Sequence, residues 1–117
     1  MAAEQLGRLS QDLTPPFLAY LANRDEAGLR AAYELGRRAM EQGVSLLDFV
    51  RTYNDVALKV LATARTADSA HDIAHAASVF LVEALASYEM AQRGFMDIGL
   101  SGSSGRNAAA EDTSGPG

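Results

Sequence analysis

Apolar residues in this chain recur every three or four positions, and this spacing restricts the fold to helices. The clearest example lies between Leu46 and Leu61, where apolar side chains follow the period of an α-helix. No segment shows the two-residue alternation of a strand, and no Asn-Gly or Asp-Gly pair marks a hairpin turn. The sequence therefore predicts an all-α fold.

Capping residues and helix breakers divide the apolar pattern into four helical segments. Asp25 and Ser45 are good N-caps, because their side-chain oxygens can accept hydrogen bonds from the free N–H groups of a first turn. Gly43 suits the left-handed residue that often ends a helix. Pro15 and Pro16 either kink the first segment or split it in two. We expect a small four-helix bundle with helices at about residues 3–23, 25–42, 45–61 and 68–98.

The composition of these segments predicts closely packed helices. The chain has no tryptophan and only four Phe and four Tyr, so we expect a core that is mostly aliphatic and rich in alanine. Gly36 lies in the middle of the second segment, where it costs helix propensity. A residue without a side chain there would let a neighbouring helix come close.

The fourth segment is apolar on two sides. One stripe includes Ala76, Phe80 and Ala84, and a second apolar set lies away from it. A helix that is hydrophobic on two sides is usually buried on two sides, and in a small domain another subunit would supply the second cover. Glu83 interrupts this stretch and must reach solvent, pair with a cation or lie at an interface. We expect dimerisation through the long C-terminal helix, at Val79, Val82, Glu83, Ala86 and Met90.

The end of the chain has a different composition. After Leu100 the sequence is rich in Gly and Ser, and apart from Pro116 it has no apolar side chain larger than alanine. Such a segment cannot bury enough surface to offset the entropy of ordering it. We therefore predict one folded domain at residues 3–99 and a flexible tail or linker at residues 100–117.

Charge and composition exclude several classes of function. A net charge of −5 argues against nucleic acid as the main partner, because contacts to phosphates need a basic surface. The chain has no cysteine, so it forms no disulfide and no thiolate metal site. It has neither a signal peptide at its start nor the roughly 18 uninterrupted apolar residues of a membrane span. These features predict a cytoplasmic protein without a membrane partner.

The sequence contains little that could support catalysis. His71 and His75 lie four residues apart on one face of a helix, a spacing at which two imidazoles can hold a metal. No third ligand is apparent, so we favour two surface histidines and predict no metal or cofactor. No nucleophile motif stands between a strand and a helix. We therefore expect a domain that binds other proteins and is not an enzyme.

Two segments resemble a known family. Residues 32–43 (AYELGRRAMEQG) and 80–95 (FLVEALASYEMAQRGF) are similar to the N-terminal regulatory domain of RsbU-type phosphatases. The second is closest to the pattern FLxEALxPFEMxxRGF of actinobacterial members, in which proline often stands at the position of Ser87. A serine there predicts a straighter helix. The resemblance covers most of residues 15–98.

The resemblance implies a fold and a set of partners. The family fold is a bundle of four helices, shared with the C-terminal domain of the clock protein KaiA, and it forms a homodimer. The domain binds a switch protein of the RsbT type, from the GHKL kinase-like group, and thereby activates an attached PPM-type serine phosphatase. That enzyme dephosphorylates an anti-sigma-factor antagonist, which releases a stress sigma factor in a partner-switching pathway.

This sequence departs from the family plan because no phosphatase domain follows. The chain is either a piece of a longer protein or a free-standing relative that would compete for the partner or act as an adaptor. We expect the partner to bind the first two helices, at Arg30, Tyr33, Arg37 and the turn at Val44.

A small-ligand sensor is the alternative to a protein-binding module. A ligand site needs a cavity with convergent polar groups, and the tyrosines are the only polar side chains on the apolar stripes. A closed core would count against this alternative.

Overall fold

The structure, a computed structural model, describes the backbone of residues 2–103 and the side chains of residues 4–93. It contains α1 (Ala2–Asn23), α2 (Glu26–Glu41), α3 (Leu46–Leu61) and α4 (Ala67–Ser103), and the described residues include no strand. The all-α fold with four helices is therefore confirmed. Helix α4 continues past its predicted end near Ile98 as far as Ser103, and the tail or linker assigned to residues 100–117 stays a prediction. The rest of the predicted tail, residues 104–117, lies outside the described residues.

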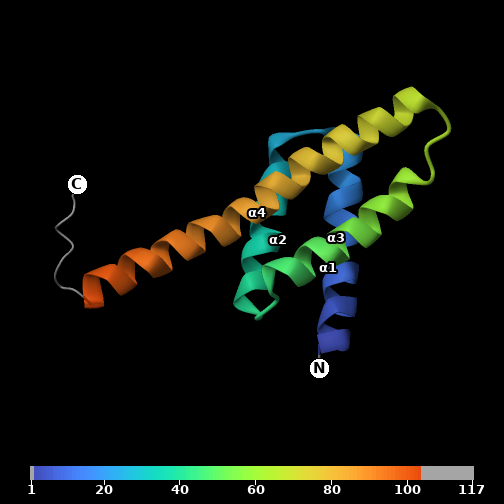
Figure 1. Cartoon of the computed structure of the whole chain (residues 1–117). Coiled ribbons are helices and arrows are strands. Elements are labelled where there is room, and N and C mark those ends of the chain that lie inside the picture. The colour runs from blue at the N-terminus through green and yellow to red at the C-terminus, as the bar shows by residue number, and fades with distance from the viewer. Residues whose placement is uncertain (1, 104–117) are drawn as a thin grey trace.

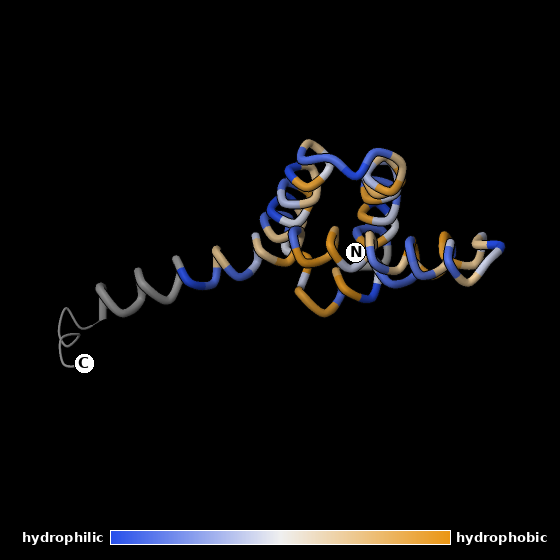
Figure 2. Tube along the Cα trace, turned by 90° about the horizontal axis from the view of Figure 1, so that it is seen from above, coloured by the Kyte–Doolittle hydropathy of each residue, from blue (hydrophilic) through white to orange (hydrophobic). Residues whose placement is uncertain are grey.

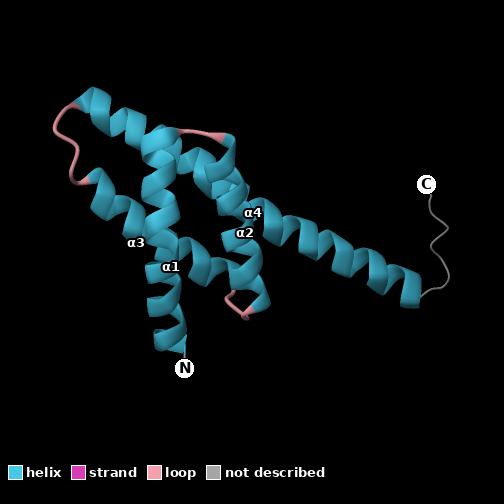
Figure 3. Cartoon of the chain, turned by 180° about the vertical axis from the view of Figure 1, so that it is seen from behind, coloured by secondary structure: helices cyan, strands magenta, loops and turns pink. Residues whose placement is uncertain are grey.

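The four helices form two crossed layers. The helices α3 and α4 lie side by side in one layer, in front of α1 and α2 in Figure 1, and the view from behind in Figure 3 brings α1 and α2 forward. Apolar and polar residues alternate along the helices, as expected of helices with one buried face (Figure 2). The C-terminal part of α4 projects beyond the other three helices (Figure 1).

The buried core is mostly aliphatic and rich in alanine, as predicted, and aromatic rings occupy its centre. Phe17 of α1 contacts Tyr53 of α3 and Phe80 of α4 edge to face, with ring centroids 5.3 and 5.4 Å apart. Tyr53 and Phe80 stack with an interplanar angle of 11°. All three side chains are buried, and the hydroxyl of Tyr53 donates a hydrogen bond to the carbonyl of Ala77. These rings join three helices at one point.

Helices α2 and α4 approach each other closely where they cross, at Gly36. A Cβ atom on Gly36 would lie 2.2 Å from the carbonyl oxygen of Ala84 and 2.5 Å from Oγ of Ser87. The hydroxyl of buried Ser87 donates to the same carbonyl at 2.7 Å, so its burial leaves no unpaired donor. The prediction that Gly36 admits a neighbouring helix is confirmed, and α2 and α4 make the most extensive helix contact of the fold.

The predicted caps are present, whereas the prolines do not divide the first helix. The carboxylate of Asp25 accepts a hydrogen bond from the Gly28 N–H at 2.9 Å, and Ser45 Oγ accepts one from the Asp48 N–H at 3.1 Å. Helix α1 continues through Pro15 and Pro16 as one element. Its burial against the other layer, at residues such as Phe17, holds it together across the hydrogen bonds that proline cannot donate.

Replacing Gly36 with alanine should destabilise the fold. The added methyl group meets backbone atoms of α4, so the two helices must separate, at a cost of about 2 kcal/mol or more. Urea unfolding followed by circular dichroism would measure the change. Gly7→Ala is the matched control, because Gly7 lies exposed in α1 with nothing within 4 Å of an added Cβ, and it should stabilise by about 0.5–1 kcal/mol. A Gly36→Ala variant as stable as the wild type would contradict the close crossing.

Two buried tyrosines should make the fold sensitive to alkali. Burial raises the pKa of Tyr88 to about 12 and raises the pKa of Tyr53 further. An unfolded tyrosine ionises near pH 10, so above that pH the unfolded state loses protons that the folded state retains. The free energy of unfolding should therefore fall as the pH rises above about 10. Replacing both residues with phenylalanine should flatten this fall in urea titrations at pH 9 to 11.5, and an unchanged slope would contradict the assignment.

Candidate protein-interaction surfaces

A groove between α2 and α4 brings together residues that the sequence analysis assigned to two different surfaces. We call it the α2–α4 groove, and its lining residues are Glu26, Leu29, Arg30, Tyr33, Glu34 and Glu83. Arg30 and Tyr33 were predicted to bind a partner, whereas Glu83 was predicted to lie in a dimer interface. They meet because the close crossing at Gly36 places this side of α4 directly against α2.

The α2–α4 groove is lined by acidic and apolar residues. It has three carboxylates, from Glu26, Glu34 and Glu83, but one guanidinium, from Arg30. Leu29 and the ring of Tyr33 are half-buried and supply apolar surface. Such a groove suits the side chain of a lysine or arginine, whose alkyl stem packs on apolar groups while its charge meets the carboxylates.

Arg37 lies beside the α2–α4 groove and is held by its own helix. Its guanidinium donates to the carboxylates of Glu34 at 2.8 Å and Glu41 at 2.6 Å. These carboxylates, Glu34 above all, raise the pKa of Arg37. A partner that uses Arg37 would have to compete with two exposed ion pairs, each worth little in solvent.

The side chain of Val44 is buried, so at this position of the predicted partner site only the turn itself lies near the surface. Its side chain is only 4% exposed. After Gly43, which has a φ of 86°, the Val44 N–H donates to the carbonyl of Ala39 and the chain turns back onto α2. This helix-ending motif brings the residue after the glycine into contact with the last turn. The Val44 carbonyl accepts a hydrogen bond from the Tyr88 hydroxyl at 2.9 Å, so the residue joins the turn to α4.

The predicted dimer residues form a partly exposed stripe on α4. Val82 and Met90 are 65% and 55% exposed, whereas Val79, Glu83 and Ala86 are half-buried. The stripe lies away from the buried residues Ala76, Ala77, Phe80 and Ala84, as the helical period requires. The structure contains one chain, so the role of these residues in a dimer stays a prediction.

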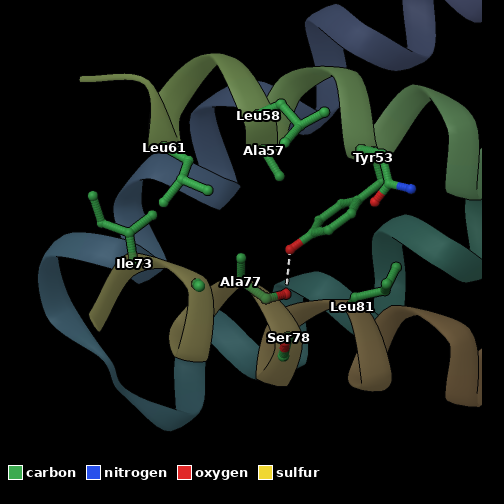
Figure 4. Close-up of a pocket in the computed structure, with 10 residues that line it drawn as sticks. Tyr53, Ala57, Leu58, Leu61, Ile73, Ala77, Ser78 and Leu81 are labelled. Carbon is green, nitrogen blue, oxygen red and sulfur yellow. Dashed lines mark hydrogen bonds between the residues drawn. The ribbon is translucent and has the colours of Figure 1, made fainter. Parts of the chain in front are cut away.

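The sequence analysis missed an apolar surface between α3 and α4. In Figure 4, Leu58 and Leu61 of α3 lie across a groove from Ile73 and Leu81 of α4, with Tyr53 between the helices. We call it the α3–α4 groove, and it has a volume of about 360 Å³. Leu58 is 62% exposed. The sequence could have indicated this apolar groove, because Leu58 is apolar but falls outside the stripe that α3 buries.

The two histidines occupy the exposed surface of α4. His71 and His75 are exposed, and Asp72 between them binds the guanidinium of Arg24 through two hydrogen bonds of 2.7 and 3.2 Å. The hydrogen bond from Arg24 is the main reason that the pKa of Asp72 lies below its ordinary value. Asp72 is thus engaged in joining the α1–α2 turn to α4. Within the described residues, no three His, Cys, Asp or Glu side chains gather as metal ligands would.

None of the helices, as far as the structure describes them, has a stretch long and apolar enough to cross a bilayer.

Comparison with known proteins identifies the family. The family model described as "Phosphoserine phosphatase RsbU, N-terminal domain" matches residues 15–91, which is more than half of the chain. The comparisons with curated proteins and with solved structures gave no significant match. The matched region spans the last turns of α1, all of α2 and α3, and the part of α4 that crosses α2. This chain therefore belongs to the family of N-terminal regulatory domains of RsbU phosphoserine phosphatases.

Proposed function

We propose that this chain is a non-catalytic interaction domain that binds an RsbT-like switch protein of the GHKL group and associates with a second copy of itself. In this way it regulates a PPM-type serine phosphatase in a cytoplasmic partner-switching pathway that controls a stress sigma factor. Membership of the RsbU family supports the regulatory role. The observation that carries the binding role is the α2–α4 groove, where Arg30, Tyr33 and Glu83 converge.

The chemistry of the α2–α4 groove indicates what the partner presents. Tyrosine and arginine are the residues that most often dominate protein interfaces, and Tyr33 and Arg30 occur here side by side. The three carboxylates favour a partner with a lysine or arginine at the centre of its contact surface. We infer that this basic side chain meets Glu83 and competes with Arg37 for Glu34, and that Arg30 meets an acidic group beside it.

A small-ligand sensor is the alternative function. The rings of Phe17, Tyr53 and Phe80 are fully buried and in contact, so the centre of the bundle is filled by protein atoms. The described grooves lie between pairs of helices at the surface. This filled core favours the protein-binding role.

Changing Arg30 and Tyr33 together to alanine should weaken binding to an RsbT-type switch protein by about 30-fold or more, because two central contacts of the groove are lost. Titration calorimetry with the purified switch protein would measure the dissociation constant. Arg51→Ala is the matched control, because this exposed arginine lines a different groove, between α1 and α3, and its loss should leave the affinity within about twofold. Equal affinities for the double variant and the wild type would contradict the proposal.

Reversing the charge of Glu83 tests the inferred chemistry of the partner. Glu83→Lys should weaken binding of the switch protein more than Glu83→Gln does, since lysine repels a basic side chain whereas glutamine only loses the attraction. Raising the salt concentration should weaken binding to the wild type, and this dependence should decrease in Glu83→Gln. Stronger binding by Glu83→Lys would show that the partner presents an acidic surface.

A further inference from the structure

A groove between α1 and α3 lies apart from the surface assigned to the switch protein. We call it the α1–α3 groove, and it has a volume of about 410 Å³. Where α1 crosses α3 (Figure 3), the first half of α1 supplies Leu6, Gly7 and Ser10 to its lining. These three residues lie outside residues 15–91, the part of the chain that matches the family model. Among the residues whose side chains are described, the α1–α3 and α2–α4 grooves share no lining residue.

Charges of alternating sign border the α1–α3 groove along α3. They are three or four residues apart and lie on one side of the helix over about 16 Å, or three turns. In sequence order they are Asp48, Arg51, Asp55 and Lys59. None of the four makes an ion pair within the part of the chain that the structure describes, whereas Arg37 on α2 pairs with two carboxylates of its own helix. The four charges are therefore available to a partner.

Two hydroxyl groups in the α1–α3 groove have no hydrogen-bond partner among residues 4–93. They belong to Ser10 of α1 and Thr52 of α3. Thr52 is only 8% exposed. A buried polar group without a partner costs about 1–3 kcal/mol, and such groups normally meet water or a ligand. The hydroxyl of Thr52 thus offers an unused hydrogen bond to whatever occupies the groove.

The backbone of α1 is open at Gly7. A Cβ atom added there meets nothing within 4 Å in the described structure. Glycine costs about 1 kcal/mol relative to alanine inside a helix, and here its missing side chain leaves space beside the apolar side chains of Leu6 and Val56. Gly7 and Ser10 lie one turn apart, so both can face the same occupant. Small residues such as these let the backbone of another helix come close.

We propose that the α1–α3 groove binds an α-helix of a second protein partner, distinct from the switch protein, whose charges alternate in sign at the same spacing. Its basic side chains would meet Asp48 and Asp55, and its acidic side chains would meet Arg51 and Lys59. Spacings of three and four residues correspond to about 4.5 and 6 Å along a helix, so a helix lying along α3 keeps this register. Side chains on one side of an extended strand are about 7 Å apart and do not. Complementary charges fix the register and exclude wrong partners.

Two synthetic peptides test the proposal by nuclear magnetic resonance with the isotope-labelled 117-residue chain. Both are alanine-based helices with two lysines and two glutamates, so neither is attracted by the net charge of −5. In the first peptide the charges alternate at spacings of three, four and four residues, and in the second they are grouped by sign. The alternating peptide should shift the amide resonances of residues 6–10 and 48–59 until saturation. The grouped peptide should bind about fivefold more weakly or less, because half of its charges meet like charges.

Substitutions in the groove distinguish a binding role from a structural one. Thr52→Val keeps the shape of the side chain and removes the hydroxyl. It should weaken binding of the alternating peptide about threefold or more and leave the fold at least as stable, because no internal hydrogen bond of Thr52 is lost in the described structure. Lower stability of this variant would overturn the role assigned to the hydroxyl. Gly7→Leu should obstruct the groove and weaken binding while favouring the helix.

Reversing the basic charges tests the complementarity. Arg51→Glu combined with Lys59→Glu should weaken binding of the alternating peptide about tenfold or more. Arg38→Glu combined with Arg65→Glu is the matched control, because it changes the net charge equally at exposed positions that line neither groove, and it should leave the affinity within about twofold.

Three outcomes would overturn the proposal: no saturable shifts with the alternating peptide, equal affinities for the two peptides, or unchanged affinity after reversal of Arg51 and Lys59. If that reversal instead abolishes binding of the switch protein, the groove belongs to the switch protein and a second partner is excluded. The proposed function fails separately, when the switch protein does not bind the wild type at all.

Discussion

The contact of Gly36 with the backbone of α4 is the constraint on which the rest of the structure depends. Any side chain at this position would overlap the carbonyl oxygen of Ala84. Because the helices touch there, α4 is seated across α2, and Phe80 is brought to the rings of Phe17 and Tyr53. Ser87 fits into the same contact because its hydroxyl bonds to its own helix. A close backbone contact and an aromatic centre therefore act together to set the angle between the two layers.

This crossing also determines how the surface is divided. Helix α4 makes its most extensive contact with α2, so the space beside that contact becomes the acidic groove that contains Tyr33 and Glu83. On the other side α4 lies beside α3 across a wider space, which leaves the uncharged groove lined by Leu58 and Leu81. One helix thus contributes to a groove with charged lining residues and to a groove with uncharged ones.

Much of the fold was predictable because it depends on local rules. The caps at Asp25 and Ser45, the turn at Gly43 and the close contact at Gly36 each follow from the chemistry of one residue and its position in the helical period. The prediction of a mostly aliphatic core is confirmed, but composition does not indicate place, so it could not show that a few rings gather at one crossing and fill its centre. The side chain of Val44, which we placed in the predicted partner site, is buried because the turn after Gly43 directs it inward.

The sequence by itself determined the helices, their order and the family to which the chain belongs, since these depend on spacing along one segment at a time. Only the tertiary structure decided which residues share a surface. Arg30 and Glu83 are far apart in the sequence, and they line one groove because α2 and α4 cross. Helical periodicity specifies which way a side chain faces on its own helix, but the neighbour that it meets depends on the crossing of two helices. The geometry of that crossing depends on how the side chains of both helices pack together, so it cannot be read from the sequence of either helix alone.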